Sequence, residues 1–269
     1  MPLTPDQQTA LVSLVRDTAR EEIMTRFRNL SDSQVMAKTG PEDLVTEADL
    51  ATEARLTVEI SELLPGALVI GEEAVEADRS LLDGVASAER AVIIDPVDGT
   101  NNFATGLTTF GVILAVVERG ETVFGLLFDP VMDDWVMARR GGGAWYAREG
   151  GAPRRLGPYS AQPASLSRAW VNLAIYPDAE ARAAVLPGFA GFARVSSMGC
   201  SCHEYRQMAR GHVHATVSPT AKLWDHAAGA LVIEEIGGTA TNGAGRRWTP
   251  ADPVAPITLR IAPGQAVPC

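Results

Sequence analysis

A short apolar run that leads directly into paired aspartates constrains this fold more than any other feature. The run ends at Ile94 and continues as Asp-Pro-Val-Asp-Gly-Thr over residues 95–100. A short β-branched run of this kind predicts a buried strand. Pro96 has a fixed φ angle and no N–H, so it stiffens the turn and interrupts the strand ladder. Asp95 and Asp98 are therefore predicted at the mouth of a buried strand.

The residues behind these aspartates are typical of an anion site. Gly99 allows a ligand to approach the backbone closely, and a turn or helix beginning at Gly99 and Thr100 would direct free N–H groups outward. Carboxylate oxygens beside such groups favour a magnesium–phosphate site, because Mg2+ takes oxygen ligands and bridges carboxylates to phosphate. Asp-Pro and Asp-Gly are also ordinary turn sequences, so a turn without a ligand is the alternative.

Three more acidic clusters lie at the predicted ends of elements. Glu72 and Glu73 follow an apolar run at 67–70, Asp49 lies in the first turn of a predicted helix, and Asp225 precedes another. Each cluster has a structural interpretation: solvated glutamates, an acid favoured by the helix dipole, and an N-cap. The combination of four clusters is more informative than any one of them.

The composition of the 269-residue chain excludes several classes of protein. It has 33 acidic and 23 basic residues and a net charge of −10, which argues against a general nucleic-acid binder. The sequence contains no long uncharged apolar run that predicts a membrane span, and its polar N-terminus indicates no secretory signal. Cys200, Cys202 and Cys269 are too few for a disulfide scaffold, so we expect a cytoplasmic location.

The N-terminal part predicts two long helices separated by a polar loop. Thr4 caps the first helix, Gln7 completes a capping box, and an apolar stripe follows at four-residue spacing. The loop covers residues 31–45. The second helix covers residues 47–64, and its inward face is predicted from Leu50, Ala54, Ile60 and Leu64.

Strand patterns dominate the middle of the chain and alternate with helices after it. Apolar runs predict strands at residues 67–70, 91–94, 110–118, 122–128 and 135–138. Later segments predict strands at 169–173, 212–217 and 257–261, with helices at 201–210 and 227–236. We expect one domain over residues 1–269, with subdomains at about 1–150 and 151–269.

The order and spacing of the acidic clusters resemble the inositol monophosphatase family of metal-dependent, lithium-sensitive phosphatases. The most specific motifs are Asp-Pro-Val-Asp-Gly-Thr at 95–100 and Trp-Asp-x-Ala-Ala-Gly at 224–229. Gly-Glu-Glu at 71–73 and Asp-Leu-Val-Thr-Glu-Ala-Asp at 43–49 accompany them. The resemblance covers residues 38–238. It implies an α/β protein with a fructose-1,6-bisphosphatase-like fold, a layered αβαβα sandwich with an α+β first half.

This resemblance implies the metal ligands. One Mg2+ ion would bind Glu72, Asp95 and the carbonyl oxygen of Val97. A second ion would bind Asp98 and Asp225 and share Asp95. A third, weaker ion would share Glu72 through water. Two ions about 4 Å apart can activate water and stabilise the leaving oxygen of an in-line displacement.

The resemblance also implies a catalytic water. Asp49 would accept a hydrogen bond from Thr100, which would orient that water with Glu72 nearby. Lys38 would lie on a mobile loop that closes over the metals. The implied reaction is hydrolysis of a small phosphomonoester such as inositol 1-phosphate, by a homodimer that Li+ inhibits.

Substrate recognition is where the sequence departs from the family pattern. The residues implied in substrate binding are Gly99, Thr100, Asp98, Asp225, Gly199, Cys200 and Ser201. Inositol enzymes of the family have a glutamate where this chain has Ser218, and Lys222 and His226 also differ from them. Histidinol phosphate, fructose bisphosphate and a 3′-phosphoadenosine 5′-phosphate therefore stay open as substrates.

Other interpretations of these motifs are less favoured. His212 and His214 could bind zinc with Cys200 and Cys202, but alternate histidines on a strand and cysteines at a helix start are usually structural. Gly-Gly-Gly at 141–143 lacks the following Lys of a nucleotide loop, so a turn is expected. A non-catalytic metal-binding relative stays open, although every acid that the metals need is present.

Overall fold

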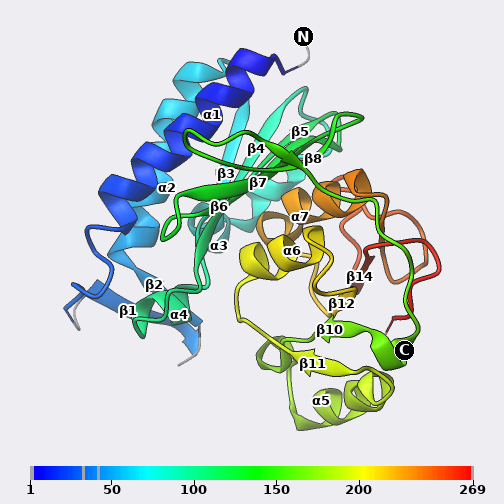
Figure 1. Cartoon of the computed structure of the whole chain (residues 1–269). Coiled ribbons are helices and arrows are strands. Elements are labelled where there is room, and N and C mark those ends of the chain that lie inside the picture. Colours follow the sequence, from blue (N-terminus) through cyan, green and yellow to red (C-terminus); the bar gives the residue numbers. More distant parts are fainter. Residues whose placement is uncertain (1–2, 32–33, 41–42, 268–269) are drawn as a thin grey trace.

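The computed structural model describes residues 3–31, 34–40 and 43–267, and it has five layers (Figure 1). The helices of these layers are α1 (Pro5–Thr18), α2 (Glu47–Leu63), α5 (Ala179–Val185), α6 (Ser201–Ala209) and α7 (Leu223–Glu235). Helices α1 and α2 cover a seven-stranded sheet, α6 and α7 separate it from a five-stranded sheet, and α5 lies outermost. The predicted αβαβα sandwich is confirmed.

The larger sheet has the strand order β3-β4-β5-β6-β7-β8-β9. Its strands are β3 (Leu68–Gly71), β4 (Ala91–Asp98), β5 (Gly111–Glu118), β6 (Glu121–Asp129), β7 (Asp134–Arg139), β8 (Gly143–Arg148) and β9 (Arg154–Arg155). The β3–β4 pair is parallel and the other neighbouring pairs are antiparallel. Along β4, Val92 and Ile94 pack toward α1 and α2, whereas Ile93 packs toward α7, as strand alternation requires.

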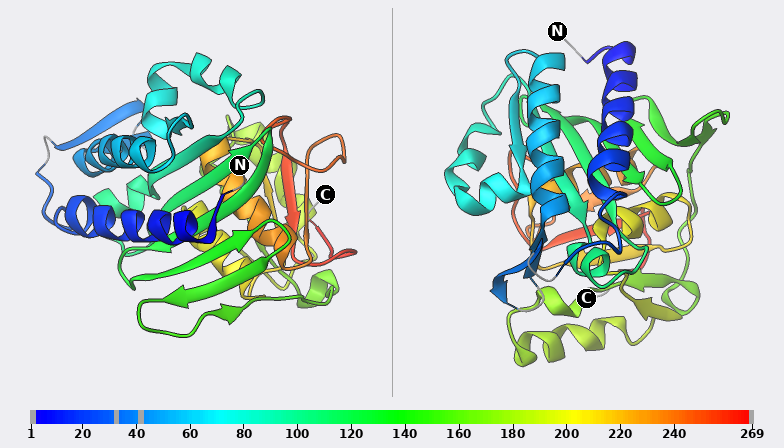
Figure 2. Two further views of the ribbon diagram at one scale, coloured as in Figure 1. Left: turned by 90° about the horizontal axis from the view of Figure 1, so that it is seen from above. Right: turned by 90° about the vertical axis from the view of Figure 1, so that its left-hand side faces the viewer.

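Helices α1 and α2 lie side by side on the outer face of this sheet (Figure 2). Thr4 and Gln7 form the predicted capping box of α1, which continues as a π-helix (Ala19–Ile23). Leu11 and Val15 of the predicted stripe are buried against the sheet.

The predicted inward face of α2 is only half right. Ile60 and Leu64 are buried, but Leu50 is 44% exposed and Ala54 is exposed. The buried stripe passes through Leu56 and Ile60, and Leu50 lies well around the helix from it. Hydrophobicity alone could not decide which apolar residues face the sheet, because α2 carries them on several sides.

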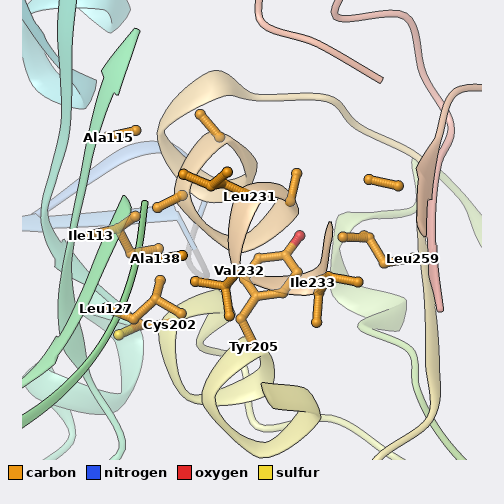
Figure 3. Close-up of a cluster of buried hydrophobic side chains, with 14 of the residues drawn as sticks. Ile113, Ala115, Leu127, Ala138, Cys202, Tyr205, Leu231, Val232, Ile233 and Leu259 are labelled. Atoms are coloured by element: carbon orange, nitrogen blue, oxygen red, sulfur yellow. The ribbon is translucent and has the colours of Figure 1, made fainter. Parts of the chain in front are cut away.

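Helices α6 and α7 are buried between the two sheets (Figure 3). Leu231 and Val232 of α7 lie among side chains of the larger sheet and Tyr205 of α6. Small residues allow this close packing: a Cβ atom on Gly229 would lie 2.2 Å from the Tyr205 ring. Helix α7 is therefore fixed between the sheets, and its first turn has a defined position.

The smaller sheet has the order β11-β10-β12-β14-β13. Its strands are β10 (Arg168–Trp170), β11 (Arg194–Ser196), β12 (Ala215–Ser218), β13 (Thr239–Thr241) and β14 (Ile257–Arg260). The sequence predicted three of them, at approximate bounds, and missed the three-residue strands β11 and β13. Short 3-10 helices complete the chain at Arg79–Gly84, Ala164–Leu166, Leu173–Ile175 and Leu186–Phe189.

Two connections differ from prediction. The polar loop expected at 31–45 contains a hairpin of β1 (Val35–Gly40) and β2 (Asp43–Thr46), paired from Val35 with Thr46. Glu72 and Glu73, expected on a loop, begin the short helix α3 (Glu72–Ala77). Both elements are too short for a periodic signal, and tertiary contacts decide them.

Candidate active site

The aspartates of β4 lie where its ladder breaks. Asp95 pairs with Ile113 and Asp98 with Gly111, so one extra residue is accommodated between them. This irregularity contains Pro96, which supplies no N–H to the ladder. The helix α4 (Thr100–Ala104) begins directly afterwards, with Gly99 as its N-cap at a φ of 88°. The chain thus turns sharply out of the sheet immediately behind both carboxylates.

Asp225 reaches the same place from the other half of the chain. Carboxylate oxygens of Asp95, Asp98 and Asp225 all lie within 4.8 Å of one another. Asp225 is not the N-cap that the sequence predicted, because α7 begins at Leu223 with Lys222 as its N-cap. An early helix start places the Asp225 carboxylate in the first turn, where it faces β4.

Asp49 and Thr100 lie within hydrogen-bond distance of each other. The Thr100 hydroxyl is 3.1 Å from Asp49 Oδ1 and 3.0 Å from the carbonyl oxygen of Val97. Asp49 belongs to a capping box with Thr46, whose N–H and hydroxyl both donate to Asp49 Oδ2. The carboxylate is therefore held by α2 while its other oxygen faces α4.

Glu72 is positioned by a residue that the sequence did not single out. The buried Glu53 carboxylate accepts hydrogen bonds from the N–H groups of Glu73 and Ala74, at 2.9 and 2.8 Å. A Cβ atom on Gly71 would lie 2.0 Å from the carboxyl carbon of Glu53. Glycine is therefore required before Glu72, and Glu53 fixes the start of α3.

Lys222 brings a positive charge to this side of the cluster. Its ammonium nitrogen lies 3.7 Å from a carboxylate oxygen of Glu72 and 3.9 Å from one of Glu76. Burial alone lowers the pKa of Lys222, but Asp225, Glu72 and Glu76 raise it above its ordinary value. The side chain is consequently charged at neutral pH.

Asp98 accepts hydrogen bonds from the first turn of α6. Its carboxylate is 3.1 Å from the N–H nitrogen of Ser201 and 3.0 Å from the Cys200 thiol, and the N–H of Cys202 also donates to it. Burial and the neighbouring Asp98 raise the pKa of the Cys200 thiol well above its ordinary value, so the thiol stays a donor. Cys200 and Ser201 therefore contact the acidic cluster directly.

The metal-free cluster is electrostatically strained. Burial, and then Glu72, Asp98, Asp225 and Asp49, raise the pKa of Asp95 well above its ordinary value. Burial and Asp225 raise the pKa of Asp98 to about 7, although its hydrogen bonds lower it. Buried carboxylates that repel one another are stabilised when a cation or a proton joins them.

One oxygen atom of the cluster indicates that the carboxylates bind a cation rather than only a proton. Asp95 Oδ1 is buried and has no hydrogen-bond partner among the described residues. A buried acceptor without a donor is costly unless a ligand completes it. Hard oxygen donors at this spacing suit Mg2+, which takes carboxylate oxygens and keeps several waters. The residues present thus fit a divalent metal.

Two further residues, also missed by sequence reasoning, hold the loop around Gly199. The Asn102 side-chain amide donates to the carbonyl oxygens of Thr109 and Met198, both at 2.8 Å. Glu204 accepts from the Met198 N–H at 2.8 Å, and burial raises its pKa to about 7. A polar residue after a helix start was the available signal, but it does not reveal that Asn102 reaches Met198, 96 residues away in sequence.

A small cavity adjoins Asp98 and Asp225. Its volume is about 140 Å3. Residues that line it include Asn172, Ser201, Glu204, Thr216 and Ser218. Ser218, which the sequence analysis considered for substrate recognition, thus lines the same cavity as Asp98 and Asp225.

Two histidines that the sequence singled out, His226 and His214, make hydrogen bonds within the fold. His226 is buried, with Nδ1 2.6 Å from the Tyr205 hydroxyl and Nε2 3.2 Å from the Thr220 carbonyl oxygen. His214 Nδ1 accepts from the N–H of Arg168. Among the described residues, His212 and His214 do not join Cys200 and Cys202 in a ligand group. The prediction for the Lys38 side chain lies outside the described residues.

The glycine-rich turn agrees with prediction. Gly141 lies in the β7–β8 turn and Gly143 begins β8, and the N–H groups of both donate to the Glu235 carboxylate. Across the described ranges, the structure contains no helix that combines the length and apolar character needed to cross a bilayer.

Comparisons with known proteins identify relatives of the whole fold. A model of the inositol monophosphatase family matches residues 6–261. The inositol-1-monophosphatase of Bacillus subtilis is 31% identical over 215 residues, 80% of this chain and 78% of that protein. The histidinol-phosphatase of Mycobacterium tuberculosis is 30% identical over 203 residues, 74% of each chain. A staphylococcal inositol monophosphatase-1, solved as a LiCl-soaked inhibitory complex, shares the fold with a TM-score of 0.80 at 19% identity, over 97% of this chain and 92% of that one.

Proposed function

We propose, because this chain belongs to the inositol monophosphatase family of phosphomonoester hydrolases, that it hydrolyses a small phosphomonoester with the help of magnesium ions. The observation that carries this proposal is the buried Asp95 Oδ1, which has no hydrogen-bond partner among the described residues and belongs to a carboxylate that meets those of Asp98 and Asp225, with ligand oxygens within 4.8 Å of one another. A bound divalent ion would satisfy that oxygen and remove the repulsion.

The proposed ligands come from both halves of the chain. Glu72, Asp95 and the carbonyl oxygen of Val97 would hold one ion. Asp98 and Asp225 would hold the second ion together with Asp95, which would therefore bind both. When bound, these ions would supply a nucleophilic water and stabilise the charge on the leaving oxygen. We assign the metal-binding part to residues 1–150 and the substrate side, with Asp225, to residues 151–269, within a single domain.

The protein's own residues would orient the water and the phosphate. Asp49, held by its capping box, directs the Thr100 hydroxyl, which leaves the hydroxyl lone pairs free to accept a hydrogen bond from the attacking water. Glu72 would lie near this water as an acceptor for its proton. The N–H groups of Gly99 and Thr100, at the start of α4, would bind phosphate oxygens.

The cavity beside Asp98 favours a small neutral leaving group. Its volume of about 140 Å3 and its hydroxyl and amide groups suit a polyol such as inositol. Ser218 would contact the leaving group, with Gly199, Cys200 and Ser201 on the opposite side. Histidinol phosphate is the second candidate, because a histidinol-phosphatase is among the relatives. A cationic leaving group would need an acid, and Glu204 already accepts from Ser197 and Met198.

Three finer expectations belong to the same proposal. Lithium would inhibit by binding at the Asp95–Asp98–Asp225 cluster, in analogy with the lithium-soaked staphylococcal relative. The protein would form a homodimer, which light scattering after gel filtration tests. A cytoplasmic location is supported by two free cysteines, Cys200 and Cys202.

Phosphate release from a substrate panel tests the function. The panel contains inositol 1-phosphate, histidinol phosphate, fructose 1,6-bisphosphate and 3′-phosphoadenosine 5′-phosphate, each with Mg2+ and with a chelator. We expect turnover with Mg2+ only, highest for inositol 1-phosphate, and loss of at least about 100-fold in Asp98→Asn. Turnover that persists in the chelator, or in the variant, would refute the metal assignment.

A further inference from the structure

Two arginines lie side by side at the edge of the smaller sheet. Strands β10 and β11 run parallel, and their register pairs Arg168 with Arg194. Register partners on neighbouring strands project to the same face, about 5 Å apart. Both side chains are exposed, and neither makes an ion pair, a side-chain hydrogen bond or a ring contact among the described residues. Like charges directly opposite each other destabilise a sheet, so this pair calls for an anion.

A cavity of about 340 Å3 lies on the face that carries the two arginines. Strand alternation places Trp170 on the same face as Arg168, and Ser196 on the same face as Arg194. All four residues line the cavity, together with Gln207 from the last turn of α6. The cavity is therefore held between the inner face of the smaller sheet and the end of α6.

The lining of this cavity contains hydrogen-bond donors that the fold leaves unused. The Ser196 hydroxyl, the Gln207 amide and the His212 ring line it, and none of these side chains makes a hydrogen bond among the described residues. The described lining includes no aspartate or glutamate, although the chain has a net charge of −10. Two guanidinium groups and three further donors without an acid match an anionic ligand.

A phosphate group suits this lining better than a carboxylate. A carboxylate has two oxygens, which a single guanidinium can occupy, whereas a phosphate group has about three strong acceptor oxygens and can bind both. The volume of about 340 Å3 is at the lower end of small-molecule sites, so it leaves room for the rest of a small phosphate ester. Trp170, Met198 and Val213 supply apolar contacts for that part.

This cavity is distinct from the one beside Asp98 and Asp225. The two cavities have no lining residue in common, and the segment from Ser196 to Ser201 leads from one to the other. Without metal ions, the acidic cluster repels a phosphate group, whereas the arginine pair attracts it. Phosphate binding to the metal-free protein therefore reports on the arginine cavity.

We propose that the cavity between Arg168 and Arg194 binds the phosphate group of a small phosphate ester, at a site separate from the proposed catalytic centre. The two guanidinium groups hold the phosphate oxygens, and the Ser196 hydroxyl and the Gln207 amide donate to the same group. This site goes beyond the proposed phosphatase function, because binding there needs neither a metal ion nor turnover.

Calorimetric titration of the metal-free protein tests this site. A chelating resin removes metal ions, because a dissolved anionic chelator would compete for the cavity, and the probes are inorganic phosphate and glucose 6-phosphate. Arg168→Gln and Arg194→Gln each remove one guanidinium group. Arg139→Gln is the matched control, since Arg139 is an exposed strand arginine that forms no ion pair in the described part of the chain and has no arginine as a register partner.

We expect one binding site for each probe in the parent and in Arg139→Gln. Affinity should fall by about 10-fold or more in Arg168→Gln and in Arg194→Gln, because each loses charge-assisted hydrogen bonds. Without phosphate, at low salt, both variants should melt at the parent's temperature or above it, since each substitution relieves the repulsion between like charges. That result would separate weaker binding from misfolding.

Three outcomes would overturn the inference. Neither probe binds the parent, or both bind the two cavity variants as tightly as the parent. Arg139→Gln loses as much affinity as the cavity variants, so that only overall charge matters. Inorganic phosphate binds but glucose 6-phosphate does not, which excludes an ester. Each of them leaves the proposed function intact, because that function is tested separately by turnover with Mg2+.

Discussion

The Thr100 hydroxyl is the residue-scale feature on which the proposed water activation depends. It lies between Asp49 Oδ1 and the Val97 carbonyl oxygen, at 3.1 and 3.0 Å. Thr100→Val keeps the shape and removes the hydroxyl, so we expect kcat to fall by about 10^2 to 10^4-fold. The increase in melting temperature with Mg2+ should persist, because none of the proposed metal ligands changes.

The matched control for this variant is Thr105, the C-cap residue of the same helix, α4. Thr105 donates to the Asn101 carbonyl oxygen at 2.8 Å, and Thr105→Val should leave kcat unchanged. Thr100→Ser should retain most of the activity. Equal kcat values for Thr100→Val and Thr105→Val would remove the hydroxyl from the mechanism.

The ionisation of Asp98 gives a second residue-scale prediction. Its pKa is raised to about 7 in the folded protein from an ordinary value of 3.8. Between these values the metal-free fold holds a proton that the unfolded chain has released. The contribution of this group to stability therefore falls as pH rises through that window. Magnesium binding should expel the proton below pH 7 and release little above it.

Calorimetry in two buffers measures this proton release. At about pH 6 the apparent enthalpy of Mg2+ binding should depend on the ionisation enthalpy of the buffer, and this dependence should weaken as the pH rises above about 7 and Asp98 ionises. The raised pKa of Asp95 acts in the same direction. Identical enthalpies in both buffers at the lower pH would mean that the carboxylates are already ionised without metal.

The aspartates of the site were predictable because carboxylates at the ends of buried elements are typical metal ligands. Asp95 and Asp98 lie at the end of a buried strand, where Pro96 interrupts the ladder, and the structure brings Asp225 within 4.8 Å of them. Glu53 and Glu204 were not predictable. Glu53 lies in mid-helix and Glu204 in the first turn of α6, and only the folded chain shows which N–H groups each carboxylate accepts from.

At the scale of elements, the start of α3 determines where Glu72 points. Gly71→Ala would place a methyl group 2.0 Å from the Glu53 carboxyl carbon. To make room, Glu53 must give up its hydrogen bonds to Glu73 and Ala74. We expect a loss of about 2 kcal/mol, which lowers the melting temperature by roughly 4–8 °C and weakens Mg2+ binding.

Gly191→Ala is the control for that substitution. Its Cβ would lie 3.7 Å from the Ala164 side chain, an ordinary contact, so thermal unfolding and Mg2+ affinity should match the parent. A Gly71→Ala protein with the parent's melting temperature would show that Glu53 can relax at no cost.

Elements were predictable in proportion to their length and burial. The strands β4 to β6 are long and buried on both faces, and continuous apolar runs revealed them. The hairpin of β1 and β2 occupies a polar segment, and α7 begins four residues before its predicted start. The first turn of α7 contains Leu223 and Trp224, which are buried by tertiary packing. No capping residue precedes them, so the sequence does not predict that the helix begins there.

At the scale of the whole molecule, the acidic cluster joins the two halves of the chain. Asp95 and Asp98 belong to the larger sheet, whereas Asp225 arrives on the helix between the sheets. Metal ions that bind this cluster bind only the folded chain, since unfolding separates the ligands. Stability should therefore follow the concentration of free Mg2+.

The expected size of this effect can be stated for each ion. Above the dissociation constant, every tenfold increase in free Mg2+ should add about 1.4 kcal/mol of stability per bound ion, seen as a steady rise in melting temperature. Asp225→Asn should flatten the rise, because it removes a ligand that the second half of the chain supplies. Asp17→Asn removes a charge from an exposed ion pair on α1 and should leave the slope unchanged. Parallel slopes for Asp225→Asn and the parent would mean that Mg2+ binds elsewhere, and that the meeting of the three aspartates does not build the metal centre.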